Sequence, residues 1–248
     1  MAISYDSLET LKSFASARAI TFPLVADPGS EIIKRFGLLN TTVAPGTRTH
    51  GIPFPGTYIV DRQGVVRSRH FEDAYQERTT VSNILARRGA PGGEAGVGPA
   101  IKAETKHLTL HATVSDAVVA PGSRISLVVD VTPRPGMHVY APGKHTYQVI
   151  RLTIDPQPWL RSENGVYPAS EIYHFKPLNE RVEVYQKPFR LLQDVTILAT
   201  QEAQKLLAGQ KNVSISGQLE YQACDDQVCY SPQRVPLSWA LEVKPLVR

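Results

Sequence analysis

The sequence predicts an α/β segment followed by an all-β domain, an antiparallel β-sandwich, and three observations support this fold class. Residues 1–88 alternate between helical and strand patterns of apolar residues. Residues 102–248 instead follow the two-residue period of strands that bury one face. Residues 89–101 lie between them and are so rich in Gly and Pro that they cannot build a core, so we expect a linker there.

The composition and charge of the chain argue against two kinds of function. The 248 residues are 42% hydrophobic and carry a net charge of +4, with no Lys/Arg run longer than Arg87–Arg88. Scattered charge of this kind makes no nucleic-acid surface, so no nucleic acid is expected as a partner. The best apolar stretch, residues 125–131, contains Asp130 and is far shorter than the roughly 20 residues of a membrane span. We therefore expect no membrane span in this chain.

The expected elements of residues 1–88 are short segments bounded by turn residues. The first helix is predicted by four apolar residues on one face: Leu8, Leu11, Phe14 and Ala15. The remaining elements are strands at 22–25, 57–60 and 65–69 and helices at 30–36 and 79–87. In the last helix, Val81, Ile84 and Leu85 are expected to face a core.

In residues 102–248, apolar and polar residues alternate along three clear strands. The apolar sets are Leu108, Leu110, Ala112 and Val114; Val213, Ile215, Leu219 and Tyr221; and Val235, Leu237, Trp239, Leu241 and Val243. Such strands, separated by Pro-Gly and Asn-Gly turns, are typical of an antiparallel sandwich. A short helix at about 201–207 is expected to interrupt them.

The two cysteines of the chain, Cys224 and Cys229, lie in the segment Tyr-Gln-Ala-Cys-Asp-Asp-Gln-Val-Cys-Tyr-Ser-Pro at 221–232. One alternating strand runs into this segment and another follows it, so we expect the cysteines near a hairpin end, close enough to form a disulfide. Thiol–disulfide exchange needs one thiolate that attacks a partner disulfide and a second thiol that resolves the mixed disulfide. The pair supplies both groups, whereas a loop this short gives little stability as a structural cross-link.

Two carboxylates, Asp225 and Asp226, separate the cysteines and are candidate partner-binding residues. Their charges raise the pKa of a nearby thiol and so weaken it as a nucleophile acting alone. This fits a relay that is attacked by another thiol better than it fits a stand-alone catalyst. We expect no metal and no cofactor.

Three stretches of the second domain resemble the N-terminal, immunoglobulin-like domain of the thiol:disulfide interchange protein DsbD. They are residues 135–143 (Pro-Gly-Met-His-Val-Tyr-Ala-Pro-Gly), the region from 167 to 185, and the cysteine hairpin at 221–232. The resemblance extends from about Lys106 to Val247 and implies a domain that passes electrons to thioredoxin-like proteins. It also implies that Cys229 is the exchanging thiol and Cys224 its resolving partner.

The same resemblance implies a cap loop that shields the cysteine pair with an aromatic side chain. At that place the chain offers Phe175, Leu178 and Tyr185. Tyr140, Tyr173 and Tyr221 are expected to line the site, although each is alternatively an ordinary tyrosine of the sandwich core.

Residues 1–88 resemble the C-terminal part of a peroxiredoxin-like or thioredoxin-like redoxin domain of the AhpC/TSA type. The match runs through residues 3–6, 20–28 and 51–61, and it places Pro55 where thioredoxin-like folds have a cis-proline beside the active site. An ordinary trans proline is the alternative. The reactive-cysteine unit of such domains is missing and no cysteine precedes Cys224, so peroxidase activity is not expected. Without its central strand, this half should expose a sheet edge and apolar surface.

These patterns favour an electron relay by thiol–disulfide exchange through Cys224 and Cys229, with a thioredoxin-fold redox protein as the partner. That partner is a separate protein, the chain's own N-terminal half or a full-length form. Two alternatives stay open: a non-catalytic redoxin-docking module with a structural disulfide, and a fragment of a peroxiredoxin-type antioxidant enzyme. The resemblance implies a bacterial periplasm, but no signal peptide follows Met1, so a cytoplasmic protein is expected if Met1 is the true start. We favour a late start or a fragment boundary at Met1 over a remnant domain.

Overall fold

The computed structural model describes residues 1–72, 76–89, 101–175 and 179–245. The chain divides into two compact units, Met1–Tyr75 and Gln76–Arg248, and each is described by itself. Apart from its end residues, the expected linker at 89–101 falls outside the described residues. No helix among the described residues combines the length and the apolar character that a membrane crossing requires.

The first unit contains two separate two-stranded sheets instead of one continuous sheet. Its elements are β1 (Ala2–Ser4), α1 (Leu8–Ala17), β2 (Leu24–Ala26), α2 (Glu31–Arg35), β3 (Gly56–Val60) and β4 (Val66–Phe71). Strand β1 pairs in parallel with β2, and β3 pairs antiparallel with β4. Three phenylalanines are about half exposed, in line with the apolar surface that the sequence predicts for this half: Phe14, Phe22 and Phe36.

Local hydrogen bonds explain where the two helices of this unit begin. Ser7 caps α1, because its hydroxyl accepts a hydrogen bond from the backbone N–H of Thr10 at 3.2 Å. The buried carboxylate of Asp27 accepts from the backbone N–H groups of Glu31 and Ile33, each at 2.9 Å. These bonds satisfy donors that the first turn of a helix leaves without partners.

The peptide bond before Pro55 is trans, as are all peptide bonds of the described residues, so the expectation of a cis-proline is wrong. The chain runs extended here, since Pro53 bridges to Leu39 and β3 starts directly after Pro55. The backbone N–H of Phe54 donates to Leu38 at 2.7 Å on one side of this path. A trans bond keeps successive Cα atoms far enough apart to continue such an extended course.

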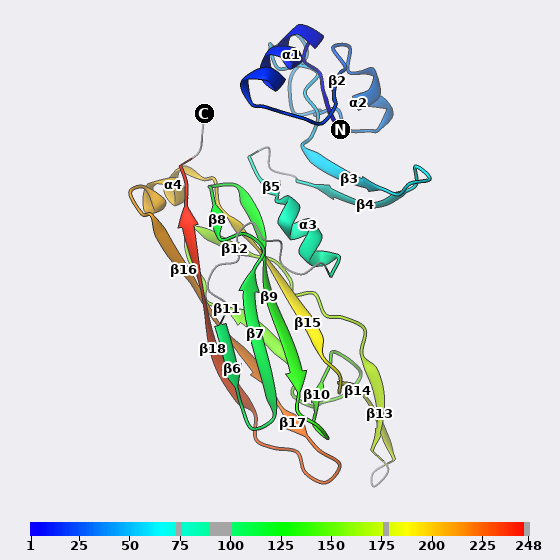
Figure 1. Cartoon of the computed structure of the whole chain (residues 1–248), viewed down its shortest axis with the longest axis vertical. Helices are drawn as coiled ribbons and strands as arrows, with labels where there is room; N and C mark the ends of the chain where they lie inside the picture. Colours follow the sequence, from blue (N-terminus) through cyan, green and yellow to red (C-terminus); the bar gives the residue numbers. More distant parts are fainter. Residues whose placement is uncertain (73–75, 90–100, 176–178, 246–248) are drawn as a thin grey trace. The chain divides into compact units, whose positions relative to one another are not determined.

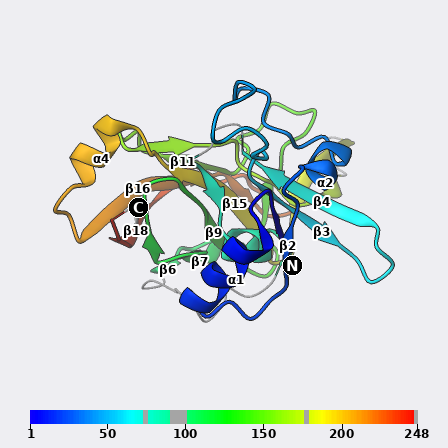
Figure 2. The same cartoon turned by 90° about the horizontal axis from the view of Figure 1, so that it is seen from above.

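The second unit is built on two sheets that enclose one hydrophobic core (Figure 1, Figure 2). One sheet has the order β12-β15-β9-β7-β6, and the other has the order β11-β16-β18-β8. The strands of the first are β6 (Ile101–Glu104), β7 (Leu108–Val114), β9 (Ser123–Pro133), β12 (Leu160–Ser162) and β15 (Phe189–Ile197). Those of the second are β8 (Val118–Val119), β11 (Arg151–Ile154), β16 (Asn212–Tyr221) and β18 (Gln233–Val243). The predicted immunoglobulin-like β-sandwich is confirmed.

The alternation seen in the sequence coincides with the core of the sandwich. In β7 the four apolar residues are at most 3% exposed, while the residues between them are half-buried. Both tryptophans of the chain, Trp159 and Trp239, lie in this core. Helix α4 (Gln201–Leu207) occupies the predicted residues, and Thr200 caps it by accepting from the backbone N–H of Ala203.

Helix α3 (Val81–Arg87) lies along the outer face of β9 and β15 and belongs to the second unit (Figure 1). The sequence had placed this helix in the first domain, with Val81, Ile84 and Leu85 facing a core. Ile84 is buried, but Val81 and Leu85 are 72% and 44% exposed. Strand β5 (Arg78–Thr79), directly before the helix, pairs in parallel with β9. The boundary between the units therefore lies at Tyr75–Gln76.

Polar contacts explain which face of α3 turns inward. Asn83 is fully buried and donates from Nδ2 to the hydroxyl of Ser126 at 2.9 Å. Arg87 forms an ion pair with the buried carboxylate of Asp194. Because a buried carboxylate is costly without a cation, this pair holds the Asn83 face of the helix against the sheet.

A third, small sheet lies at the end of the sandwich opposite α4 (Figure 1). It has the order β13-β14-β10-β17. Its strands are β10 (His138–Tyr140), β13 (Glu171–Phe175), β14 (Glu180–Tyr185) and β17 (Ala223–Cys224). This sheet carries the cysteine hairpin.

Candidate active site

The two cysteines are bonded to each other across a hairpin. Strand β17 follows β16, and the chain turns back so that Cys224 and Cys229 form an antiparallel bridge with their Cα atoms 4.1 Å apart. On its other side, Cys224 pairs with His138 of β10. The disulfide thus joins the end of the third sheet to the returning loop.

The two ends of the disulfide differ in exposure. Cys224 is 1% exposed and packs with Tyr140, Val182 and Val184 in a small cluster of its own. Cys229, on the returning loop, is exposed. The Cys229 end of the disulfide is therefore the end closer to solvent, whereas the protein covers the Cys224 end.

Asp225 shapes the turn between the cysteines. One oxygen of its carboxylate accepts the backbone N–H groups of Gln227 and Val228 at 2.8 and 2.7 Å, and the other accepts the hydroxyl of Tyr230 at 2.8 Å. These hydrogen bonds, those of the backbone first, lower the pKa of Asp225, so its carboxylate stays charged at neutral pH. Such a side-chain turn is a common role of Asp in loops.

The hydroxyl of Tyr140 lies between the two sulfurs, 3.2 Å from Sγ of Cys224 and 3.3 Å from Sγ of Cys229. Sulfurs in a disulfide carry no proton, so the hydroxyl is the donor in both contacts. Burial, followed by the neighbouring Tyr147, raises the pKa of Tyr140 to about 12. Tyr140 is therefore a neutral proton-bearing group at physiological pH.

Two further tyrosines beside the disulfide donate to carboxylates. Tyr147 stacks on Tyr140, with ring centroids 4.3 Å apart and an interplanar angle of 4°, and donates to Glu180 at 2.5 Å. Tyr173 donates to Asp226 at 2.6 Å, which raises the pKa of Tyr173 to about 12. Two aromatic side chains of the site are thus hydrogen-bonded to two of its carboxylates.

These groups enclose a small pocket of about 50 Å³ over the disulfide. Of the residues nominated from the sequence, the pocket brings together both cysteines, Tyr140, Tyr173, Phe175 and Asp225. Asp226 reaches the same site through Tyr173. Leu178, a candidate for the cap, lies outside the described residues.

Two nominated tyrosines belong to the sandwich core instead of the site. Tyr221 is fully buried and donates to the hydroxyl of Thr105 at 2.8 Å. Tyr185 stacks on Phe189 and donates to a backbone carbonyl at Pro168. Tyr185 pairs with Val139, and side chains alternate along β10, so Tyr185 lies on the core face while His138 and Tyr140 face the disulfide.

The sequence patterns do not point to several residues that line the site. They are His138, Tyr147, Glu180, Val182, Gln227 and Val228. The alternation of His138 and Tyr140 around Val139 was a usable signal for His138. Burial lowers the pKa of His138, and the charges of Asp226 and Asp225 oppose this effect. Glu180 reaches the site through the register of β14, and Tyr147 lies in the segment between β10 and β11, so no local pattern encodes either placement.

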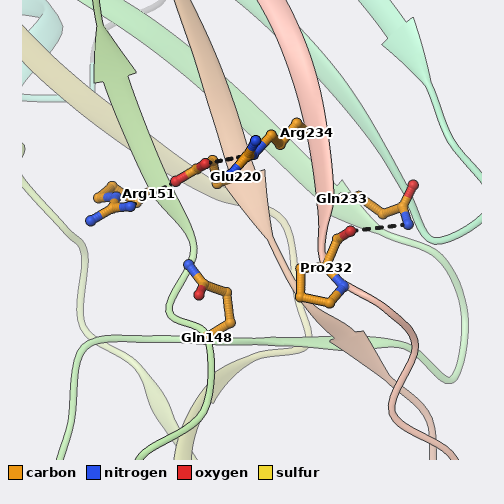
Figure 3. Close-up of a pocket in the computed structure, with 6 residues that line it drawn as sticks. All are labelled: Gln148, Arg151, Glu220, Pro232, Gln233 and Arg234. Carbon is orange, nitrogen blue, oxygen red and sulfur yellow. Dashed lines mark hydrogen bonds and ion pairs between the residues drawn. The ribbon is translucent and has the colours of Figure 1, made fainter.

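A larger pocket of about 480 Å³ lies apart from the cysteines (Figure 3). Glu220 lies between two arginines of this pocket and accepts hydrogen bonds from Arg151 at 2.7 Å and Arg234 at 2.8 Å. Gln148, Pro232 and Gln233 complete its lining (Figure 3). These residues include no cysteine, whereas both cysteines line the smaller pocket.

The fold and the site together define a thiol–disulfide redox protein of the immunoglobulin-like β-sandwich type. Residues 108–237 match the family described as "Thiol:disulfide interchange protein DsbD, N-terminal". This match covers more than half of the chain, which therefore belongs to that family. Residues 1–69 match the AhpC/TSA family, in agreement with the redoxin-like pattern of the first unit.

Individual similar proteins match this chain over part of its length. Two putative peroxiredoxins of Mycobacterium tuberculosis are each 33% identical over 64 residues, which is 26% of this chain and 40% of each relative. The chain thus spans less than half the length of these curated relatives. The crystal structure of the N-terminal periplasmic domain of ScsB from Proteus mirabilis aligns with a TM-score of 0.39 at 13% identity, over 60% of this chain and 52% of that one.

Proposed function

We propose that the chain exchanges disulfides with a thioredoxin-fold redox protein, with Cys229 as the attacked sulfur and Cys224 as the resolving thiol. The observation that supports this most is the unequal exposure of the bonded pair, 1% at Cys224 against an exposed Cys229. Exchange requires direct access of a thiolate to the sulfur that it attacks. Cys229 offers that access.

In the proposed reaction, a thiolate of the partner attacks Sγ of Cys229. The S–S bond to Cys224 breaks, its electron pair stays on Sγ of Cys224, and a mixed disulfide joins the partner to Cys229. The partner's second thiol then attacks the partner sulfur of this mixed disulfide and releases Cys229 as a thiolate. The partner leaves oxidised and the pair holds two electrons, which the reverse sequence delivers to another disulfide.

The proposed site of action is an oxidising bacterial compartment, the periplasm. Disulfides persist in such compartments, and the family to which the chain belongs is described as one of thiol:disulfide interchange. The acidic residues Asp225 and Asp226 disfavour a free thiolate, which argues against a cysteine that acts as a nucleophile on its own.

The test is trapping with a thioredoxin whose second active-site cysteine is replaced by serine. Variants Cys224→Ser and Cys229→Ser of the whole chain are first loaded with thionitrobenzoate on their remaining cysteine. We expect the Cys224→Ser chain to form a covalent complex with the thioredoxin at least about tenfold faster, because its remaining cysteine is the exposed residue of the pair. Complex formation is measured by intact mass and by release of the dye.

Equal trapping by the two variants would contradict the assignment of Cys229. A second measurement separates exchange from a structural disulfide, since the reduction potential of inert bridges lies below about −300 mV. A potential in that range, with no trapping by either variant, would favour a redoxin-docking module.

A further inference from the structure

The contact between Tyr140 and the disulfide has a chemical consequence beyond lining the pocket. The hydroxyl is within hydrogen-bond distance of both sulfurs, and the residue is 4% exposed. Strand β10 fixes its place, because Tyr140 lies two residues after His138, whose partner in the sheet is Cys224. Backbone pairing therefore holds the hydroxyl beside the disulfide.

The surrounding groups leave this hydroxyl free for sulfur. Glu180 is bonded to Tyr147, and Asp226 is bonded to Tyr173. The stacked ring of Tyr147 also prevents the ring of Tyr140 from turning away on that side. The nearby carboxylates thus have their own tyrosine donors, and Tyr140 points at the reacting atoms.

We propose that Tyr140 is a catalytic hydrogen-bond donor that stabilises the Cys224 thiolate as it leaves during attack on Cys229. This inference rests on the proposed exchange function. As the S–S bond breaks, its electron pair goes to Sγ of Cys224 and a new S–S bond forms between Cys229 and the incoming sulfur. Tyr140 keeps its proton throughout and donates a hydrogen bond that becomes charge-assisted once Sγ is negative.

The buried position of Cys224 gives such a donor a clear role. A thiolate that forms at a residue 1% exposed receives little help from water, and the carboxylates of Asp225 and Asp226 repel it. A donor aimed at the place where charge develops stabilises the transition state more than the ground state. Because the thiolate is a better acceptor than a disulfide sulfur, the same bond also favours the reduced pair.

The test compares Y140F with the wild-type chain, using dithiothreitol as the attacking thiol so that protein docking has no influence. We expect Y140F to react at least about tenfold more slowly, the effect of losing a hydrogen bond to a charged group. The equilibrium should also shift about tenfold toward the disulfide, which is about 30 mV for a two-electron couple. In a Cys229→Ser background, alkylation against pH should show a higher pKa for the Cys224 thiol when Tyr140 is replaced.

The matched control is Y221F, which removes a buried hydroxyl from the same domain away from the disulfide. It should exchange at the wild-type rate. If the wild-type chain exchanges and Y140F does so within twofold, with an unchanged equilibrium, the role of Tyr140 is refuted. If the wild-type chain does not exchange at all, the proposed function itself fails.

A second variant covers the case in which Y140F does not fold. Incorporation of 3-fluorotyrosine at position 140 keeps the ring and makes the hydroxyl a stronger donor. The reaction with dithiothreitol should then be faster than in the wild-type chain. An equal or slower rate in this folded variant would overturn the proposal.

Discussion

Arg87 of helix α3 and Asp194 of strand β15 form an ion pair in which the carboxylate is almost fully buried, with Nε of Arg87 3.1 Å from Oδ2 of Asp194. The hydroxyl of Ser126 donates to the second oxygen of the same carboxylate at 2.7 Å. The helix therefore supplies the only cation that the described structure bonds to this carboxylate.

Replacement of Arg87 by methionine should destabilise the sandwich by about 2 kcal/mol, because it leaves a buried charge without its cation while Ser126 still bonds it. Urea unfolding followed by tryptophan fluorescence measures this, since Trp159 and Trp239 both lie in the sandwich core. The control is Arg88→Met at the neighbouring exposed arginine. Equal midpoints for the two variants would contradict a role for the pair.

Gly122 is expected to tolerate no side chain. Its φ of +92° is strained for other residues, and a Cβ there would lie 2.2 Å from the backbone carbonyl oxygen of Gln76. Gly122→Ala should cost about 3 kcal/mol and detach β5, whereas Gly136→Ala, with φ of +78° and open space, should cost about 1 kcal/mol. Hydrogen exchange at Arg78, whose N–H bonds to Gly122, reports the detachment. Similar costs for both variants would refute the clash.

The stability of the sandwich should fall on mild acidification because of His138. Burial lowers its pKa below the ordinary 6.5, so between these two values the unfolded chain binds more protons than the folded one. The free energy of unfolding therefore decreases as pH drops from 6.5 through the folded pKa. His107, whose pKa burial also lowers, adds an effect of the same sign.

The measurement is the urea midpoint by tryptophan fluorescence at pH 7.5, 6.5 and 5.5. His138→Phe keeps an aromatic ring against Tyr173, whose ring centroid lies 4.4 Å from that of His138. The urea midpoint of this variant should depend less on pH than that of the wild-type chain. His50→Phe, in the other unit, serves as the control and should leave the wild-type profile. An unchanged slope in His138→Phe would show that other groups cause the pH dependence.

The turn at Asp225 should control how readily the disulfide forms. Asp225→Ala removes the acceptor of two backbone N–H groups, so the reduced cysteines spend less time close together and disulfide formation becomes several-fold less favourable. Asp225→Asn keeps an oxygen for those bonds and should remain near the wild type. The measurement is the oxidised fraction of each variant in glutathione buffers, determined by mass after alkylation. A disulfide in Asp225→Ala as stable as in Asp225→Asn would exclude the turn as the cause.

The sandwich could be predicted because its signal is local. Leu108 to Val114 alternate in sequence and in burial, and the hairpin that holds Cys224 and Cys229 lies between two such strands. The partners of the disulfide could be predicted only in part. Tyr140 and Tyr173 were found, but Glu180 depends on the register of β14, and Tyr147 depends on how the chain folds back between β10 and β11.

Helix α3 shows a second limit of sequence patterns. Its apolar residues lie on more than one side of the helix. Val81 and Leu85, which the sequence pattern predicts to face a core, are exposed. The inner face is determined by Asn83 and Arg87, whose partners Ser126 and Asp194 are far away in sequence. A polar network of this kind has no periodicity to detect.

The docking of α3 determines where the chain can be divided. A fragment that begins at the Gly- and Pro-rich segment would leave the carboxylate of Asp194 without its cation and uncover Val128 and Leu192, which Ala86 now covers. We expect such a fragment to aggregate through this exposed apolar surface. A fragment that begins at Gln76 keeps this cover and contains the whole second unit, so it allows the disulfide to be studied apart from the redoxin-like segment.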